Sequence, residues 1–171
     1  NSRAIELRNI RAVINSAIDD EIIDKYPFRK FKIKTRVESN TDPLSIEKLK
    51  EIINYKSHRE ALNVARDVFM ASFYLLGING HDLYDLQKSD RAIYSRKKTG
   101  RKYNLPLEQE VIQIINRYPD DEKMFSFYHR YTTYDSFKSR MNHYLKVIGS
   151  ELGIPNLTMY HARHTYANIA Y

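Results

Sequence analysis

The amino-acid sequence predicts a mainly α-helical fold with one small β-hairpin. Several segments repeat apolar residues at steps of three and four, the spacing of a helix that buries one face. In contrast, AIYSRKKTGRKYNLPL has two short runs rich in Tyr and Ile on either side of a Lys-Thr-Gly-Arg turn, which is typical of a hairpin. The 171 residues are 42% hydrophobic, so the chain can bury a core.

The first helix is expected where an apolar stripe runs from Ile10 to Ile18. The segment KYPFRKFKIKTRVESNTDP follows, with two prolines, six basic residues and a polar run, and is typical of an extended linker. A domain boundary is therefore expected between a first part, residues 1–36, and a second part, residues 42–171. The first part is too short to bury a core alone. Because the sequence begins with Asn and stops soon after the last motif, we expect it to be part of a longer protein.

Five helices are expected in the second part. Ser45 can cap the first of them. The next, within residues 59–78, is apolar around much of its circumference, so it should lie at the centre of the core. Two amphipathic segments follow the hairpin, at Glu108–Arg117 and at Tyr134–Leu152. The last helix should contain LTMYHARHTYANIAY and begin near Thr158.

Composition narrows the possible partners and the compartment. The chain has 28 Lys and Arg against 21 Asp and Glu, a net charge of +7, which favours a polyanionic partner. It has no cysteine, which excludes disulfides and thiolate metal sites and favours a reducing compartment. No apolar run approaches the roughly twenty residues of a membrane helix. We expect a cytoplasmic protein that does not enter membranes.

In the last helix, Tyr160, Arg163 and His164 are three or four residues apart and should share one face. The residues alone leave two interpretations open: an amphipathic helix whose Arg and His reach solvent, or an anion-binding face. The free amides at the start of the helix would reinforce the second. The basic hairpin turn also has two interpretations: its charges could simply be solvated, or they could contact phosphates.

The order of the segments LLGINGHDLYDLQKSD, YSRKKTG, LPL and LTMYHARHTYA resembles the tyrosine recombinase (phage integrase) family, in particular integrases from mobile elements of Bacteroides-type bacteria. RNIRAVINSAIDDEIIDKYPFRKFKI is similar to the end of the family's helical core-binding (SAM-like) domain. The resemblance implies that residues 1–36 are a remnant of that domain and that residues 42–171 are a catalytic domain, incomplete at its C-terminus.

The resemblance also implies roles for single residues. Arg163 would grip the scissile phosphate, for which a planar guanidinium is well suited. Tyr160 stands at the family's His position and could donate a hydrogen bond to the phosphate, with His164 on the same face. Lys98 would protonate the leaving 5′ oxygen.

Two departures from the family pattern bear on activity. Asn79 stands where members carry a second Arg, close to an acidic match at Asp82. Arg96 is the candidate to supply the missing charge, and the alternative is that it is only a solvent-facing strand residue. The family's tyrosine nucleophile lies farther along the chain than Tyr171, so the chain as given should not cleave DNA.

The implied function is site-specific DNA recombination and integration through a 3′-phosphotyrosyl intermediate, without a metal, ATP or other cofactor. The implied partner is double-stranded DNA, bound by a tetramer of the full-length protein, while the chain as given would be a monomer or dimer. Further DNA contacts are expected from Lys30, Lys32, Lys34, Arg36, Lys97, Arg101 and Lys102. Two alternatives remain: a non-catalytic or regulatory DNA-binding relative, and a basic helical scaffold that never touches nucleic acid.

Overall fold

The computed structural model describes residues 2–31, 33 and 42–170. Within these residues the fold is mainly helical, with one two-stranded antiparallel sheet, which confirms the expected fold class at this level. The chain divides into two compact units, Asn1–Asn40 and Thr41–Tyr171. Each unit is described by itself.

The first unit consists of helix α1 (Ser2–Asp19) and a segment of turns that follows it. The guanidinium of Arg11 lies over the ring of Phe28, 5.3 Å from its centroid, and donates a hydrogen bond of 3.1 Å to the carbonyl of Phe31. These contacts fix the segment against the helix. The apolar stripe is only partly covered within the unit, with Ile10 and Val13 exposed and Ile14, Ala17 and Ile18 half-buried.

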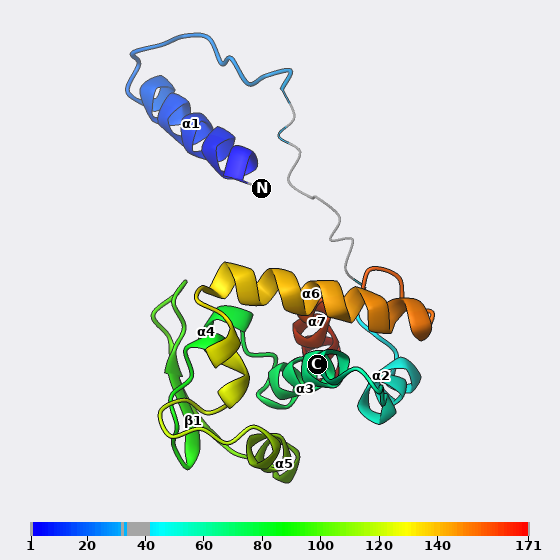
Figure 1. The fold of residues 1–171 in the computed structure, drawn as a ribbon. Helices are drawn as coiled ribbons and strands as arrows, with labels where there is room; N and C mark the ends of the chain where they lie inside the picture. Colours follow the sequence, from blue (N-terminus) through cyan, green and yellow to red (C-terminus); the bar gives the residue numbers. More distant parts are fainter. Residues whose placement is uncertain (1, 32, 34–41, 171) are drawn as a thin grey trace. The chain divides into compact units, whose positions relative to one another are not determined.

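The second unit contains the remaining elements (Figure 1). In chain order they are α2 (Ile46–Asn54), α3 (Glu60–Tyr74), α4 (Gly80–Tyr84), β1 (Arg91–Ser95), β2 (Lys102–Pro106), α5 (Gln109–Arg117), the 3₁₀ helix η1 (Ser126–Arg130), α6 (Tyr134–Glu151) and α7 (Met159–Ala170).

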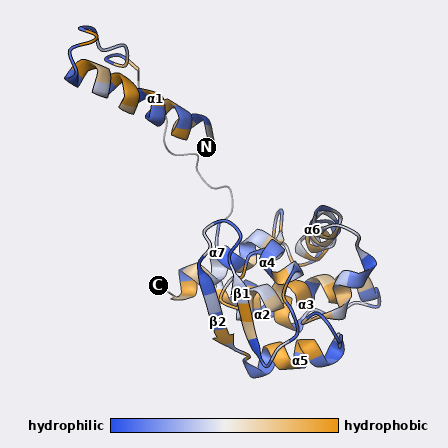
Figure 2. Ribbon diagram, turned by 90° about the vertical axis from the view of Figure 1, so that its left-hand side faces the viewer, coloured by the Kyte–Doolittle hydropathy of each residue, from blue (hydrophilic) through white to orange (hydrophobic). Residues whose placement is uncertain are grey.

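Helix α3 is the centre of this unit, as its apolar circumference predicts. It packs against α5, α6 and α7, and Val68, Phe69 and Ala71 are completely buried. Figure 2 shows its hydrophobic residues among the other helices. Ser45 caps α2 as expected, because its side chain accepts a hydrogen bond from the amide of Lys48.

The long helix ends at Tyr74, earlier than the apolar pattern suggested. Leu76 and Gly77 both adopt left-handed backbone conformations, with φ of 58° and 68°, which a right-handed helix cannot contain. The hydroxyl of Ser72 donates to the carbonyl of Ile78 and closes the resulting turn. Asn79 and helix α4 follow this turn directly. The sequence pattern did not predict α4.

The hairpin is present where the sequence predicts it. Tyr94 and Tyr103 are directly opposed in the antiparallel register, and their rings stack with centroids 4.9 Å apart. The turn closes with hydrogen bonds from the amides of Arg96 and Gly100, and Gly100 has the left-handed φ of 66° that such a turn needs. Figure 2 shows hydrophilic residues along β2.

Candidate anion-binding site

A pocket of about 250 Å³ lies where α7, α6 and the start of α4 meet. We call it the Arg163 pocket. It is lined by Ile78, Asn79, Gly80, Tyr134, Lys138, Asn142, Thr158, Met159, Tyr160 and Arg163. The lining contains an arginine and a lysine but no carboxylate, so its charge is positive.

Arg163 is held in place by the turn that precedes α4. Its Nη1 donates a hydrogen bond of 2.7 Å to the carbonyl of Gly77. A Cβ atom on Gly77 would lie 3.0 Å from the Cα of Arg163, so only glycine allows the turn and α7 to approach this closely. The carbonyl is neutral, and no ion pair of Arg163 occurs within the described residues. The guanidinium therefore keeps its full charge and its other N–H groups beside the pocket.

Two asparagine amides add hydrogen-bond donors. The Oδ1 of Asn79 accepts from the amide of His81 at 2.9 Å and caps α4, and the Oδ1 of Asn142 accepts from the amide of Met159 at 3.0 Å. A backbone N–H can only donate, so in each case the side-chain oxygen must face it. Both side chains line the pocket, and neither NH₂ group has a hydrogen-bond partner among the described residues.

Tyr160 and His164 are neighbours on α7, but only Tyr160 lines the pocket, and His164 is half-buried. Tyr160 is 54% exposed, and its ring meets that of His164 edge to face with centroids 4.3 Å apart. His161, by contrast, is buried; its Nδ1 accepts from the amide of Thr158, and burial lowers its pKa. His161 therefore fixes the start of the helix and is not part of this face.

The expectation of free amides at the start of α7 is wrong for two of them. The amide of Met159 is bound by Asn142, and the amide of Thr158 is bound by His161. These side chains satisfy backbone donors that a helix start would otherwise leave open. Anion binding in the pocket must therefore come mainly from side chains.

The hairpin turn is anchored on α4 rather than inserted into the pocket. The Nζ of Lys97 lies 2.9 Å from Asp85 Oδ2, and the amide of Lys97 donates to Asp82 Oδ1 at 3.3 Å. Lys98 is exposed at the tip of the turn, and Arg96 is half-buried; neither lines the pocket. The sequence-predicted site residues are thus brought together only in part.

The charges of Arg96 and Arg163 both affect the pKa of Tyr94. Burial raises the pKa of Tyr94 to about 12, with Tyr103 and then Asp82 adding to the rise, while Arg163 and Arg96 oppose it. Neither Arg96 nor Tyr94 lines the Arg163 pocket.

The remaining predicted DNA contacts are scattered. Lys30 and Lys102 are exposed, and Arg101 lies over the ring of Tyr103 at 5.5 Å. Four residues singled out from the sequence fall outside the described residues: Lys32, Lys34, Arg36 and Tyr171.

Sequence reasoning missed the contribution of α6. Tyr134, Lys138 and Asn142 follow one another at steps of four, which places them on one face of this helix beside the pocket. The spacing was readable in the sequence, but the polar face of an amphipathic helix is ordinarily solvated, so the spacing alone did not indicate a site.

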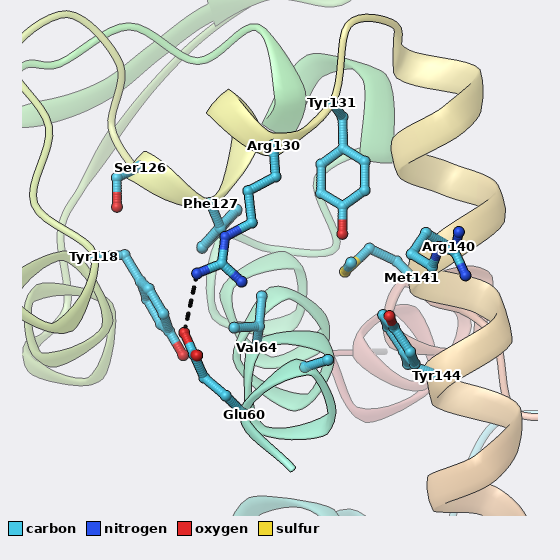
Figure 3. Close-up of a pocket in the computed structure, with 11 residues that line it drawn as sticks. Glu60, Val64, Tyr118, Ser126, Phe127, Arg130, Tyr131, Arg140, Met141 and Tyr144 are labelled. Carbon is cyan, nitrogen blue, oxygen red and sulfur yellow. Dashed lines mark hydrogen bonds and ion pairs between the residues drawn. The ribbon is translucent and has the colours of Figure 1, made fainter.

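A second pocket, of about 400 Å³, lies between α3, α5, η1 and α6 (Figure 3). We call it the aromatic pocket, because its lining includes Tyr118, Phe127, Tyr131 and Tyr144. Its two arginines already have partners. Arg130 forms an ion pair of 3.1 Å with Glu60, and Arg140 lies over the ring of Tyr144 at 6.0 Å.

None of the family models, curated proteins or solved structures compared with the chain matches it. Among the helices of the described residues, none is long and apolar enough to cross a membrane. The same residues contain no group of three His, Asp or Glu side chains arranged to hold a metal ion. The proposed function therefore rests on the Arg163 pocket.

Proposed function

We propose that the chain binds duplex DNA, that the Arg163 pocket receives a backbone phosphodiester, and that the protein is a DNA strand transferase of the tyrosine recombinase type. The observation that carries the proposal is the pocket itself, where Arg163, with no carboxylate partner among the described residues, stands beside the NH₂ groups of Asn79 and Asn142. Phosphate oxygens only accept hydrogen bonds, so a lining rich in donors suits them.

The proposed reaction exchanges one phosphoester for another. A tyrosine oxygen attacks the phosphorus atom, a phosphotyrosyl bond forms, and the bond to the 5′ oxygen breaks, with that oxygen taking a proton as it leaves. Negative charge on the non-bridging oxygens increases in the transition state, and a guanidinium already fixed by Gly77 stabilises it without reorganising. Tyr160, exposed at the pocket, donates a further hydrogen bond.

Lys98 is the proposed proton donor to the leaving oxygen. An ammonium can fill this role if bound DNA brings the 5′ oxygen to the hairpin turn. Tyr134 is not proposed as the nucleophile, because burial raises its pKa and so disfavours the phenolate.

One observation favours a second candidate, a DNA-binding relative without activity. Asn79 stands where the resembled family carries an arginine, and its side-chain oxygen is committed to capping α4. A pocket with a weakened clamp could still hold a phosphate and yet stabilise the transition state poorly.

Salt-dependent binding tests the shared part of both candidates. We expect affinity for a duplex oligonucleotide to fall steeply with added salt, because counterions are released when basic side chains contact phosphates. A flat response would contradict DNA binding. Cleavage of a suicide duplex by the product of the complete reading frame separates the candidates: a covalent protein–DNA adduct supports the transferase, and its absence supports the non-catalytic relative.

A further inference from the structure

We infer that α6 provides the second half of the anion site, with Lys138 supplying the positive charge that Asn79 lacks and Asn142 supplying an amide donor. The inference rests on the proposed function only for the identity of the anion, a DNA phosphodiester. The chemistry recognised is that of any phosphate group small enough for the pocket.

The geometry of α6 aims these residues at one place. Lys138 and Asn142 are four residues apart, one helical turn, and both line the Arg163 pocket. The contact between the Asn142 oxygen and the amide of Met159 shows which way this face points: toward the first turn of α7. Lys138 therefore enters the pocket lining from α6, whereas Arg163 enters from α7.

The charges of the two residues are not compensated within the described residues. Neither Lys138 nor Arg163 belongs to any ion pair there, and no carboxylate lines the pocket. Two like charges that line one pocket repel each other, and an anion between them removes that cost. Lys138 is itself exposed to solvent, and what distinguishes it from other exposed lysines is that it lines this pocket.

Arg96, the candidate suggested by the sequence, is less well placed. It does not line the pocket, and its neighbour Lys97 fixes the hairpin turn on α4 through Asp85 and Asp82. These contacts of Lys97 hold the hairpin turn against α4 and outside the pocket lining. Lys138 needs no such change.

The test is a titration of the full chain with inorganic phosphate, followed by ¹H–¹⁵N NMR of the side-chain amides. In the parent we expect saturable shifts of the NH₂ signals of Asn79 and Asn142. Lys138→Ala should weaken phosphate binding about tenfold, the effect typical of losing one charged hydrogen bond, and Lys138→Arg should largely restore it. Lys146→Ala, an equal loss of charge on the same helix, and Arg96→Ala should bind as the parent does.

Alanine favours helix, so Lys138→Ala should fold, and its backbone spectrum reports whether it does. The inference is overturned if phosphate leaves the parent amides unmoved, if Lys138→Ala binds phosphate as the parent does, or if Arg96→Ala takes the larger loss. Failure of the proposed function looks different: the chain would show no salt-dependent affinity for duplex DNA, while the effect of Lys138 on inorganic phosphate remained.

Discussion

The Arg163 pocket and the aromatic pocket differ in how their cations are paired. The aromatic pocket is the larger of the two and contains two arginines. Arg130 forms an ion pair with Glu60 (Figure 3), and the guanidinium of Arg140 lies over the ring of Tyr144 at 6.0 Å. In the Arg163 pocket the arginine donates a hydrogen bond to a neutral carbonyl and has no carboxylate partner among the described residues. An anion gains most from a cation that no carboxylate already holds. Arg130 is held by a carboxylate and Arg163 is not, so unpaired charge rather than pocket size is the basis of the proposed function.

The largest effect is expected from removing the central cation. Arg163→Ala should weaken binding of inorganic phosphate about thirtyfold, roughly 2 kcal/mol, because a charge-assisted hydrogen bond and its local charge are both lost. Arg130→Ala in the aromatic pocket is the matched control and should leave phosphate binding unchanged. NMR titration measures both. Equal losses in the two variants would show that the pockets do not differ as described.

Replacing Gly77, which packs against Arg163, should cost more stability than replacing a glycine of similar backbone conformation elsewhere. Gly77 and Gly153 have φ of 68° and 66°, but an added Cβ meets the backbone of Arg163 at Gly77 and nothing within 4 Å at Gly153. Gly153→Ala should cost about 1 kcal/mol of unfolding free energy from backbone strain, and Gly77→Ala about 2 kcal/mol or more.

Urea unfolding of the two variants measures these costs. Gly77→Ala should also weaken phosphate binding, because it displaces Arg163, while Gly153→Ala should not. If both variants lose the same stability and bind phosphate equally, close packing of the turn on α7 has no role in positioning the arginine.

Alkaline pH should destabilise the hairpin beside the Arg163 pocket. Burial raises the pKa of Tyr94 to about 12 from an ordinary value near 10. The neutral phenol is thus favoured in the folded state, so its contribution is complete below pH 10 and is lost as pH rises toward 12. Unfolding free energy measured across this window should fall less steeply for Tyr94→Phe than for the parent. Identical slopes would contradict the assignment.

The smallest effect is expected from freeing the arginine of the aromatic pocket. Glu60→Gln removes the partner of Arg130 and should give the aromatic pocket weak affinity for phosphate, seen as a shift of the Arg130 Nε–H signal. Stability should change by less than about 1 kcal/mol, because both side chains of the pair are exposed. If phosphate does not shift the Arg130 signal in Glu60→Gln, the ion pair with Glu60 is not the reason that the aromatic pocket does not bind anions.

The sequence predicts those parts of the fold whose signal lies within one continuous stretch of chain. The stripes of α3, α5 and α6 and the turn chemistry of the hairpin are each contained in one stretch of chain. Helix α4 and η1 have five residues each, too few to show a period in the sequence. Helix α4 follows the left-handed turn at Leu76 and Gly77, and η1 depends on tertiary packing.

The same limit explains the candidate site. Tyr160, Arg163 and His164 lie on one helix, so spacing alone places them on a common face. The contribution of Lys138 and Asn142 depends on how α6 packs beside α7, which no local pattern encodes. The expected role of Arg96 came from the resemblance and stays a prediction that the phosphate titration tests.

NMR of the full chain during addition of a short duplex at low salt tests whether DNA phosphate binds in the Arg163 pocket, as proposed. We expect the Arg163 Nε–H signal and the NH₂ signals of Asn79 and Asn142 to shift with saturation, while the signals of Arg130 and Arg140 do not move. Shifts confined to Arg130 and Arg140, or no shift of Arg163 when DNA is bound, would contradict it.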